Sequence, residues 1–198
     1  MARRLPQRYG GAMETALSLA GQFLLAMPGI GDPRFDKAVI AMCVHDEAGA
    51  MGIGLGRLAP RIGFHALLKQ LDIAPGAAPN VAIHLGGPVE PQRGFILHSP
   101  DWTSDESIDV DGRWVLSATI DILRAIAAGE GPTRWVAALG YAGWGPGQLE
   151  QELSRHGWFA TQGTESLLYE CDVEMRWTAA FQAAGIDSRL LAAESGTA

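Results

Sequence analysis

The sequence predicts an α+β fold with a mixed, mainly antiparallel sheet and helices around it. Segments typical of strands and of helices follow one another without the regular βαβ alternation of a doubly wound sheet. Asp111-Gly112 lies in the middle of the segment 109–116 and is typical of a two-residue hairpin turn, which joins antiparallel strands. Several apolar runs are short and bounded by glycine or proline, as buried strands are.

The first half of the chain contains short apolar runs that predict strands at residues 22–27, 38–45, 51–55, 81–85 and 94–98. Gly52, Gly54 and Gly56 interrupt or follow the third run, which indicates a bulge or close backbone packing there. One helix is predicted between the third and fourth strands, because apolar residues recur with helical spacing at Phe64, Leu67, Leu68 and Leu71.

The second half is predicted to contain a hairpin, one strand and three helices. In chain order these are the hairpin at 109–116, a helix from Thr119 to Gly129, a strand at 135–139, a helix that begins at Pro146 and a helix from Asp172 to Gly185. Threonine is a favoured N-cap residue, and glycine often ends a helix in the left-handed conformation. Proline suits the first position of a helix, because its missing N–H would have no partner there.

A chain of 198 residues is long enough to bury the core of one domain. Residues 1–14 and 188–198 are small, polar or charged and lack periodicity. We therefore expect a flexible tail at each end and a single domain over residues 15–187.

The net charge of −7 opposes binding to nucleic acid or to anionic membranes, which requires clustered Lys and Arg. The two cysteines, Cys43 and Cys171, are too few for a disulfide framework and indicate free thiols in a reducing compartment. The start of the chain imitates a secretory signal, but its apolar stretch at 15–21 is short. No window approaches the roughly 18 apolar residues of a membrane helix, so we expect a cytoplasmic protein.

Six motifs resemble the YqgE/AlgH family of bacterial proteins, in the same order along the chain from about residue 17 to 187. They are LAGQFLLAMPG at 19–29, GDPRF at 31–35, GAMG at 49–52, LGGPV at 85–89, RGFILHS at 93–99 and GYAGWGPGQLE at 140–150. The resemblance implies a partly barrel-like, bifurcated sheet surrounded by helices. It implies no defined activity, since the family is largely described as of unknown function. One member is linked to control of alginate synthesis as a proposed transcriptional regulator. One departure is visible. Where members typically read Asn-Arg-Pro after the third strand, this chain has Gly56-Arg57-Leu58, which alters any functional surface that includes this turn.

Cys43 and His45 are two positions apart on a predicted strand, so their side chains are expected on the same face. A thiol beside an imidazole could be an activated nucleophile or half of a metal site. The simpler interpretation is a small buried thiol followed by a histidine where the strand meets solvent. The sequence lacks C-x-x-C and H-E-x-x-H spacings, and His84 and His98 could join a metal site only by spatial coincidence. We expect no metal and no cofactor.

Two glycine-rich segments are the candidate binding surface for a ligand or partner. We assign this role to Gly86, Gly87, Pro88, Gly143, Trp144, Gly145 and Gln148. Little side chain covers the backbone there, so accessible N–H groups and the start of the following helix could bind an anion or an acidic peptide. Trp144 would then supply apolar contact, although packing in the core is its alternative role. Glu150 and Glu152 are expected on a solvated helix face.

Three functions remain open from the sequence. The first is a non-catalytic protein that acts in regulation through a protein partner or a small anionic effector. The second is a thiol-dependent enzyme that uses Cys43 and His45. The third is a DNA-binding transcriptional regulator, which the negative charge disfavours. No nucleophile elbow or phosphate-binding loop motif supports another activity.

Overall fold

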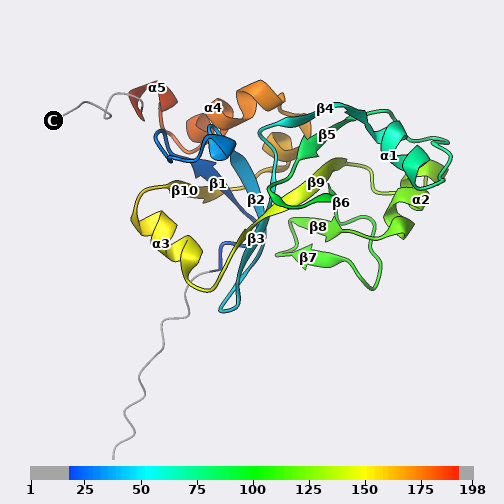
Figure 1. Cartoon of the computed structure of the whole chain (residues 1–198), viewed down its shortest axis with the longest axis horizontal. Coiled ribbons are helices and arrows are strands. Elements are labelled where there is room, and N and C mark those ends of the chain that lie inside the picture. Colours follow the sequence, from blue (N-terminus) through cyan, green and yellow to red (C-terminus); the bar gives the residue numbers. More distant parts are fainter. Residues whose placement is uncertain (1–17, 192–198) are drawn as a thin grey trace, which may run out of the picture.

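The computed structural model describes residues 18–191, which form one curled, mainly antiparallel sheet with helices around it (Figure 1). Its strands are β1 (Gln22–Ala26), β2 (Val39–Asp46), β3 (Gly49–Gly54), β4 (Leu58–Gly63), β5 (Ala82–Leu85), β6 (Val89–His98), β7 (Ile108–Val110), β8 (Trp114–Ser117), β9 (Trp135–Trp144) and β10 (Trp158–Gln162). Its helices are α1 (Phe64–Gln70), α2 (Ile120–Ala128), α3 (Gln148–Ser154), α4 (Val173–Ala183) and α5 (Ser188–Leu191), with a 3₁₀ turn η1 (Pro33–Phe35) and a π-helical turn η2 (Ser166–Glu170).

The strands are connected in the order β10-β1-β2-β3-β9-β6-β8-β7, while β5 pairs with β9 and β4 pairs with β5. Every pairing is antiparallel except the one between β5 and β9, which is parallel. This arrangement confirms the predicted α+β class and the mixed, mainly antiparallel sheet. The hairpin predicted at Asp111-Gly112 is present between β7 and β8, where Val110 is paired with Trp114.

The sheet divides along β9, because the two halves of this strand have different neighbours on one side. Residues Ala137 to Leu139 pair with β5, whereas Ala142 to Trp144 pair with β3. Gly140 lies between the two halves with a φ of 72°, a conformation that L side chains rarely adopt. The bifurcation expected from the resemblance is therefore located at one glycine.

The turn after β5 crosses β9 with backbone directly against backbone. A Cβ atom added to Gly86 would lie 2.1 Å from the carbonyl oxygen of Gly140, and one added to Gly87 would lie 2.1 Å from the carbonyl carbon of Tyr141. No side chain fits at such distances. These glycines are therefore required by the packing of the fold itself.

Three hydrophobic clusters cover the sheet. The largest lies under η2 and α4, where Phe23, Trp114, Leu168 and Phe181 are nearly inaccessible to solvent. A second packs α1 and α2 against β5, β6 and β9, and a third packs α3 against β1, β2 and the end of β9. The alternation of β1 explains this division, because Phe23 and Leu25 face the first cluster while Leu24 and Ala26 face the third.

Several predicted elements are confirmed with small shifts at their ends. Helix α2 begins after Thr119 and ends at Gly129, which adopts the predicted left-handed conformation with a φ of 77°. Helix α4 follows Asp172, as expected, and ends two residues before Gly185. The strands predicted from the first five apolar runs correspond to β1, β2, β3, β5 and β6, although β6 begins at Val89, before the predicted start at Gly94.

Other predictions differ from the structure. The strand predicted at 135–139 continues as β9 through Trp144, so the glycine-rich segment is largely a strand rather than a loop. Helix α3 begins at Gln148, because Gly147 precedes it with a φ of 69°, and Pro146 therefore lies outside the helix. Ser188–Leu191 forms a short helix within the predicted C-terminal tail. The N-terminal tail predicted at 1–14 lies outside the described residues, as do residues 192–198.

Strands β4 and β10 were not predicted. β4 contains Pro60 and mostly exposed residues, and β10 is five residues long. Neither segment shows a continuous apolar run or an Asp-Gly turn, the two features that predict the other strands. Among residues 18–191, no helix is long and apolar enough to cross a membrane.

Candidate functional site

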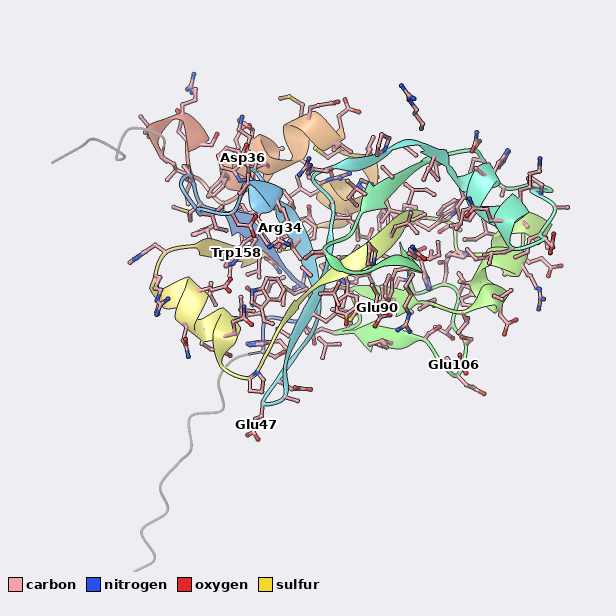
Figure 2. The ribbon with its side chains drawn as sticks, in the orientation of Figure 1. Arg34, Asp36, Glu47, Glu90, Glu106 and Trp158 are labelled. Carbon is pink, nitrogen blue, oxygen red and sulfur yellow. The ribbon has the colours of Figure 1, made fainter. Side chains whose placement is uncertain are left out.

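A pocket of about 200 Å³ opens where three turns of the structure meet. These are η1 with the residues before β2, the turn between β3 and β4, and the turn between β5 and β6. Arg57 lies on the turn between β3 and β4 and lines the cavity, which we therefore call the Arg57 pocket. Figure 2 labels Arg34 of η1, which lines the pocket, and Glu90 at the start of β6, which follows the turn between β5 and β6.

The walls of the Arg57 pocket are mainly apolar. Six apolar side chains line it: Phe35, Ala38, Val39, Ile40, Leu85 and Pro88. Val39 and Ile40 are fully buried, whereas Leu85 is 40% exposed at the mouth. An exposed leucine beside an apolar cavity is a contact that a ligand could cover.

Glycines let the three turns approach one another around the pocket. A Cβ atom on Gly54 would lie 2.8 Å from the carbonyl oxygen of Leu85, and one on Gly56 would lie 3.2 Å from that of Lys37. The amide of Gly54 donates to the carbonyl of Gly86 at 2.7 Å. The sequence predicts a bulge or close packing at Gly54 and Gly56, and the structure confirms close packing at both.

Two guanidinium groups line the Arg57 pocket, and their surroundings differ. Arg34 forms an exposed ion pair with Asp32, with Nη2 2.6 Å from Oδ2, and its hydrogen bonds hold the pKa of Asp32 below its usual value. Arg57 is exposed and pairs with no carboxylate within residues 18–191. The positive charge available to a ligand is therefore that of Arg57.

Backbone donors add to this positive character. The amides of Gly56, Arg57 and Gly87 donate no hydrogen bond to another residue in the described part of the chain. In contrast, the neighbouring amides of Leu85 and Gly86 donate to Arg57 and Leu139. Unpaired backbone N–H groups beside a cationic side chain are a common arrangement for binding anions.

The predicted binding residues do not all lie at this pocket. Gly86, Gly87 and Pro88 line it, but Gly143, Trp144, Gly145 and Gln148 do not. The amide of Gly145 donates to the side-chain oxygen of Gln148 at 3.0 Å, which closes the turn before α3. The expectation that both glycine-rich segments and Trp144 line one concave surface is therefore wrong.

Trp144 is a core residue rather than an exposed docking group, since only 7% of it is accessible to solvent. Its Nε1 donates to Oε2 of Glu152 at 3.0 Å, and its ring packs edge-on against Trp158. Trp158 donates to the same oxygen at 2.8 Å. Glu152 was expected on a solvated face, and the structure instead places it against two indoles.

Cys43 and His45 do not share a face of the sheet. A β-bulge shifts the pairing with β3, so that Met42 is opposite Gly52 but Val44 is already opposite Met51. Cys43 then lies in the large core with Val44 packed against it, while His45 lies beside Ala50 on the other side. The extra residue of the bulge reverses the alternation assumed from the sequence. The two side chains therefore cannot form a catalytic pair.

The environment of Cys43 also argues against an activated thiol. The residue is 3% exposed, and burial raises the pKa of its thiol to about 12. A reactive cysteine requires the opposite, a stabilised thiolate at an accessible position. Within residues 18–191, no group of three or more His, Cys, Asp or Glu side chains could hold a metal ion.

His45 has a different role, in which it connects three segments. Its Nδ1 accepts a hydrogen bond from the amide of Leu19 at 3.0 Å, so the ring donates from Nε2 to Oε1 of Glu150 at 2.8 Å. The hydroxyl of Ser18 donates to the carbonyl of His45. His45 therefore attaches the residues before β1 and helix α3 to the β2–β3 hairpin, and Glu150 is not simply solvated.

A serine–histidine network that sequence reasoning missed lies between β6 and β8. Nδ1 of His98 donates to the carbonyl of Ser99, and the hydroxyl of Ser117 donates to Nε2 of His98, each at 2.9 Å. Ser107 continues the network at 2.8 Å from Ser117. His98 and Ser117 have no accessible surface, so no substrate reaches them, and we interpret the network as structural. The motif at 93–99 contains His98, but only strand pairing brings Ser117 near it.

Together these features define an α+β protein whose sheet bifurcates at a glycine of β9, with a small apolar pocket beside the bifurcation. The chain belongs to the AlgH-like family, whose sequence pattern matches residues 23–189. It is 60% identical over 186 residues to a UPF0301 protein of Rhizorhabdus wittichii, which covers 94% of this chain and all of that relative. A UPF0301 protein of Novosphingobium aromaticivorans is 56% identical over 186 residues, which again cover 94% of this chain and all of that relative.

Solved structures support the same assignment. The solution structure of AlgH from Pseudomonas aeruginosa matches with a TM-score of 0.76 and 34% identity, covering 97% of this chain and all of that one. A crystal structure of a protein from Corynebacterium diphtheriae matches with a TM-score of 0.72 at 21% identity, over 91% of this chain and 95% of that one, and shows the fold alone. The family resemblance seen in the six motifs is confirmed.

Proposed function

We propose that this protein is a non-catalytic regulator that acts through a small effector or a protein partner bound at the Arg57 pocket. The observation that carries the proposal is the pocket itself, in which apolar walls adjoin an arginine without a carboxylate partner. Pockets that combine apolar lining with a few directed polar groups are typical of ligand sites.

The size of the pocket favours a small molecule or a single inserted side chain. A volume of about 200 Å³ is smaller than the roughly 300 Å³ at which pockets for drug-sized ligands begin. A protein partner would therefore bind across the surface and insert one residue here. Either mode of binding is consistent with regulation without chemistry.

The chemical groups that could support catalysis are poorly placed for it. Cys43 is buried with a raised thiol pKa, and His98 with Ser117 is enclosed. A thiol-dependent activity that uses Cys43 and His45 is accordingly not proposed. Direct DNA binding is disfavoured by the net charge of −7, because polyphosphate binding depends on clustered cations.

A variant that fills the pocket tests the proposal. Ala38→Leu adds apolar volume at a half-buried lining position, and Ala66→Leu makes the same change at an exposed position of α1. Both variants should melt close to the wild type. The wild type should capture a partner from bacterial lysate or show a melting-temperature shift with a metabolite. Ala38→Leu should lose this binding, and Ala66→Leu should keep it.

Two results would contradict the proposal. Equal signals from the wild type and Ala38→Leu would place the binding surface elsewhere. If the wild type neither captures a partner nor shows a melting shift, the proposal that this protein acts by binding at the Arg57 pocket would be wrong.

A further inference from the structure

We propose that the Arg57 pocket binds a carboxylate with a short unbranched apolar tail, such as a medium-chain fatty acid. This inference rests on the proposed function and specifies the class of ligand. The tail would lie among the apolar walls, and the carboxylate would lie against Arg57 and the free amides beside it. No covalent step is involved.

The dimensions of the pocket define the tail. A methylene group occupies about the same volume as a water molecule in the liquid, which is about 30 Å³. The pocket volume of about 200 Å³ therefore has room for about seven such groups. The lining side chains Phe35, Val39, Ile40 and Leu85 offer no hydrogen bonds. An apolar chain of about seven carbons fits this space better than a sugar or a nucleoside, whose hydroxyl groups would be left without partners.

The donors at the pocket define the head group. Arg57 can present two parallel N–H groups to a carboxylate, and the amides of Gly56, Arg57 and Gly87 are free in the described structure. These groups are all donors, so a cationic head group would find no acceptor among them. A neutral alcohol would use only part of this set.

The charge at the pocket favours a monoanion over a dianion. Arg34 also lines the pocket, but both oxygens of Asp32 already accept hydrogen bonds from it. One uncompensated positive charge therefore remains, that of Arg57, and it matches a carboxylate. A phosphate would bring a second negative charge without a partner on the described chain.

The inference is tested by calorimetric titration of the full chain with octanoate, octanol, octylamine and octyl phosphate. Octanoate should bind at least tenfold more tightly than each of the others, since hydrogen bonds to a charged group contribute about that factor. In the series from butanoate to octanoate, each added methylene should tighten binding about fourfold, until the pocket is filled.

A matched pair of variants distinguishes a specific contact of Arg57 with the ligand from an effect of the protein's net charge. Arg57→Gln should weaken octanoate binding about tenfold. Arg61→Gln removes an exposed arginine four residues away that does not line the pocket, and it should leave binding unchanged. Ala38→Leu should shorten the preferred chain.

The failure of this inference can be distinguished from failure of the proposed function. Octanol binding as tightly as octanoate, or no effect of Arg57→Gln, would overturn the carboxylate assignment while leaving the pocket as a binding site. Preference for octyl phosphate would assign the head group to a phosphate instead. Absence of binding by all four probes overturns the inference, and the capture experiment with Ala38→Leu then decides independently whether the pocket has another occupant.

Discussion

The guanidinium of Arg176 donates a hydrogen bond to the carbonyl oxygen of Leu55, a residue 121 positions earlier in the chain. Arg176 is 3% exposed, and it also donates to the carbonyls of Leu167 at 2.8 Å and Cys171 at 2.7 Å. One side chain of α4 therefore holds both ends of the π-helical turn and the β3–β4 turn. Since Leu55 directly precedes Gly56 and Arg57, α4 positions one side of the Arg57 pocket.

Replacing Arg176 by methionine should destabilise the protein. The substitution keeps an apolar stem but removes the donor to three carbonyl groups, of which those of Leu55 and Leu167 are buried and that of Cys171 is partly buried. The loss is partly offset, because a buried charge is also removed. We expect the free energy of unfolding to fall by about 2–4 kcal/mol, measured by urea denaturation. Arg155→Met at an exposed position of the chain should change it by less than about 0.5 kcal/mol. Equal stability of the two variants would show that Arg176 does not hold these segments together.

Replacing Gly140 by alanine should be far more damaging than the same change at Gly145. Gly140 has a φ of 72°, and a Cβ atom there would lie 2.5 Å from the carbonyl oxygen of Gly87. Gly145 has no positive φ, and its nearest neighbour would be 3.9 Å away. Gly140→Ala should lower the free energy of unfolding by about 3 kcal/mol or more, and Gly145→Ala by at most about 0.5 kcal/mol. A tolerated alanine at Gly140 would contradict the close backbone crossing.

Glu152 should stabilise the protein in a pH-dependent way. Burial raises the pKa of this carboxylate, but hydrogen bonds from Trp158, Gln148 and Trp144 outweigh it and leave the pKa below the ordinary value of 4.5. A lowered pKa in the folded state stabilises the protein above that ordinary value, and the stabilisation is lost as pH falls through the folded-state pKa.

The measurement is urea unfolding followed by tryptophan fluorescence. Glu152→Gln should lower the free energy of unfolding by about 1–2 kcal/mol at neutral pH, because two indole N–H groups lose a charged acceptor. The difference from the wild type should shrink as pH falls below the ordinary carboxylate pKa of 4.5 and through the lower pKa of the folded state. Glu106→Gln, on the exposed loop between β6 and β7, serves as the control (Figure 2). A pH-independent difference for Glu152→Gln would refute the role of its charge.

The thiol of Cys43 should react only when the protein unfolds. Burial raises its pKa to about 12, so almost no thiolate is present at neutral pH. Alkylation by iodoacetamide in a Cys171→Ser background should therefore be slow in buffer and fast in denaturant, as followed by mass spectrometry. Rapid labelling of the folded protein with an apparent pKa below the ordinary range would restore the thiol-enzyme hypothesis.

The fold class, the family and most of the helices and strands could be predicted from the amino-acid sequence alone. The apolar runs that became β1, β2, β5 and β6 are continuous, and those of β1, β5 and β6 lie beside glycine or proline, while α2 and α4 carry local start and stop signals. Such features depend on residues that are close in the chain, so they can be recognised without knowledge of the fold. β4 and β10 lack them, because their strand conformation results from pairing with a neighbour.

Which residues lie together at a site could not be predicted from the sequence, because contacts between distant segments determine it. The bulge at Cys43 separated it from His45, and packing against Glu152 made Trp144 a core residue. Gly86 and Gly87 line a pocket, as does Arg57, which lies on a different turn. Bulges, backbone crossings and buried hydrogen bonds arise between segments that are distant in the sequence, so local patterns do not reveal them. Local spacing specifies which residues could act, and long-range packing decides which of them meet.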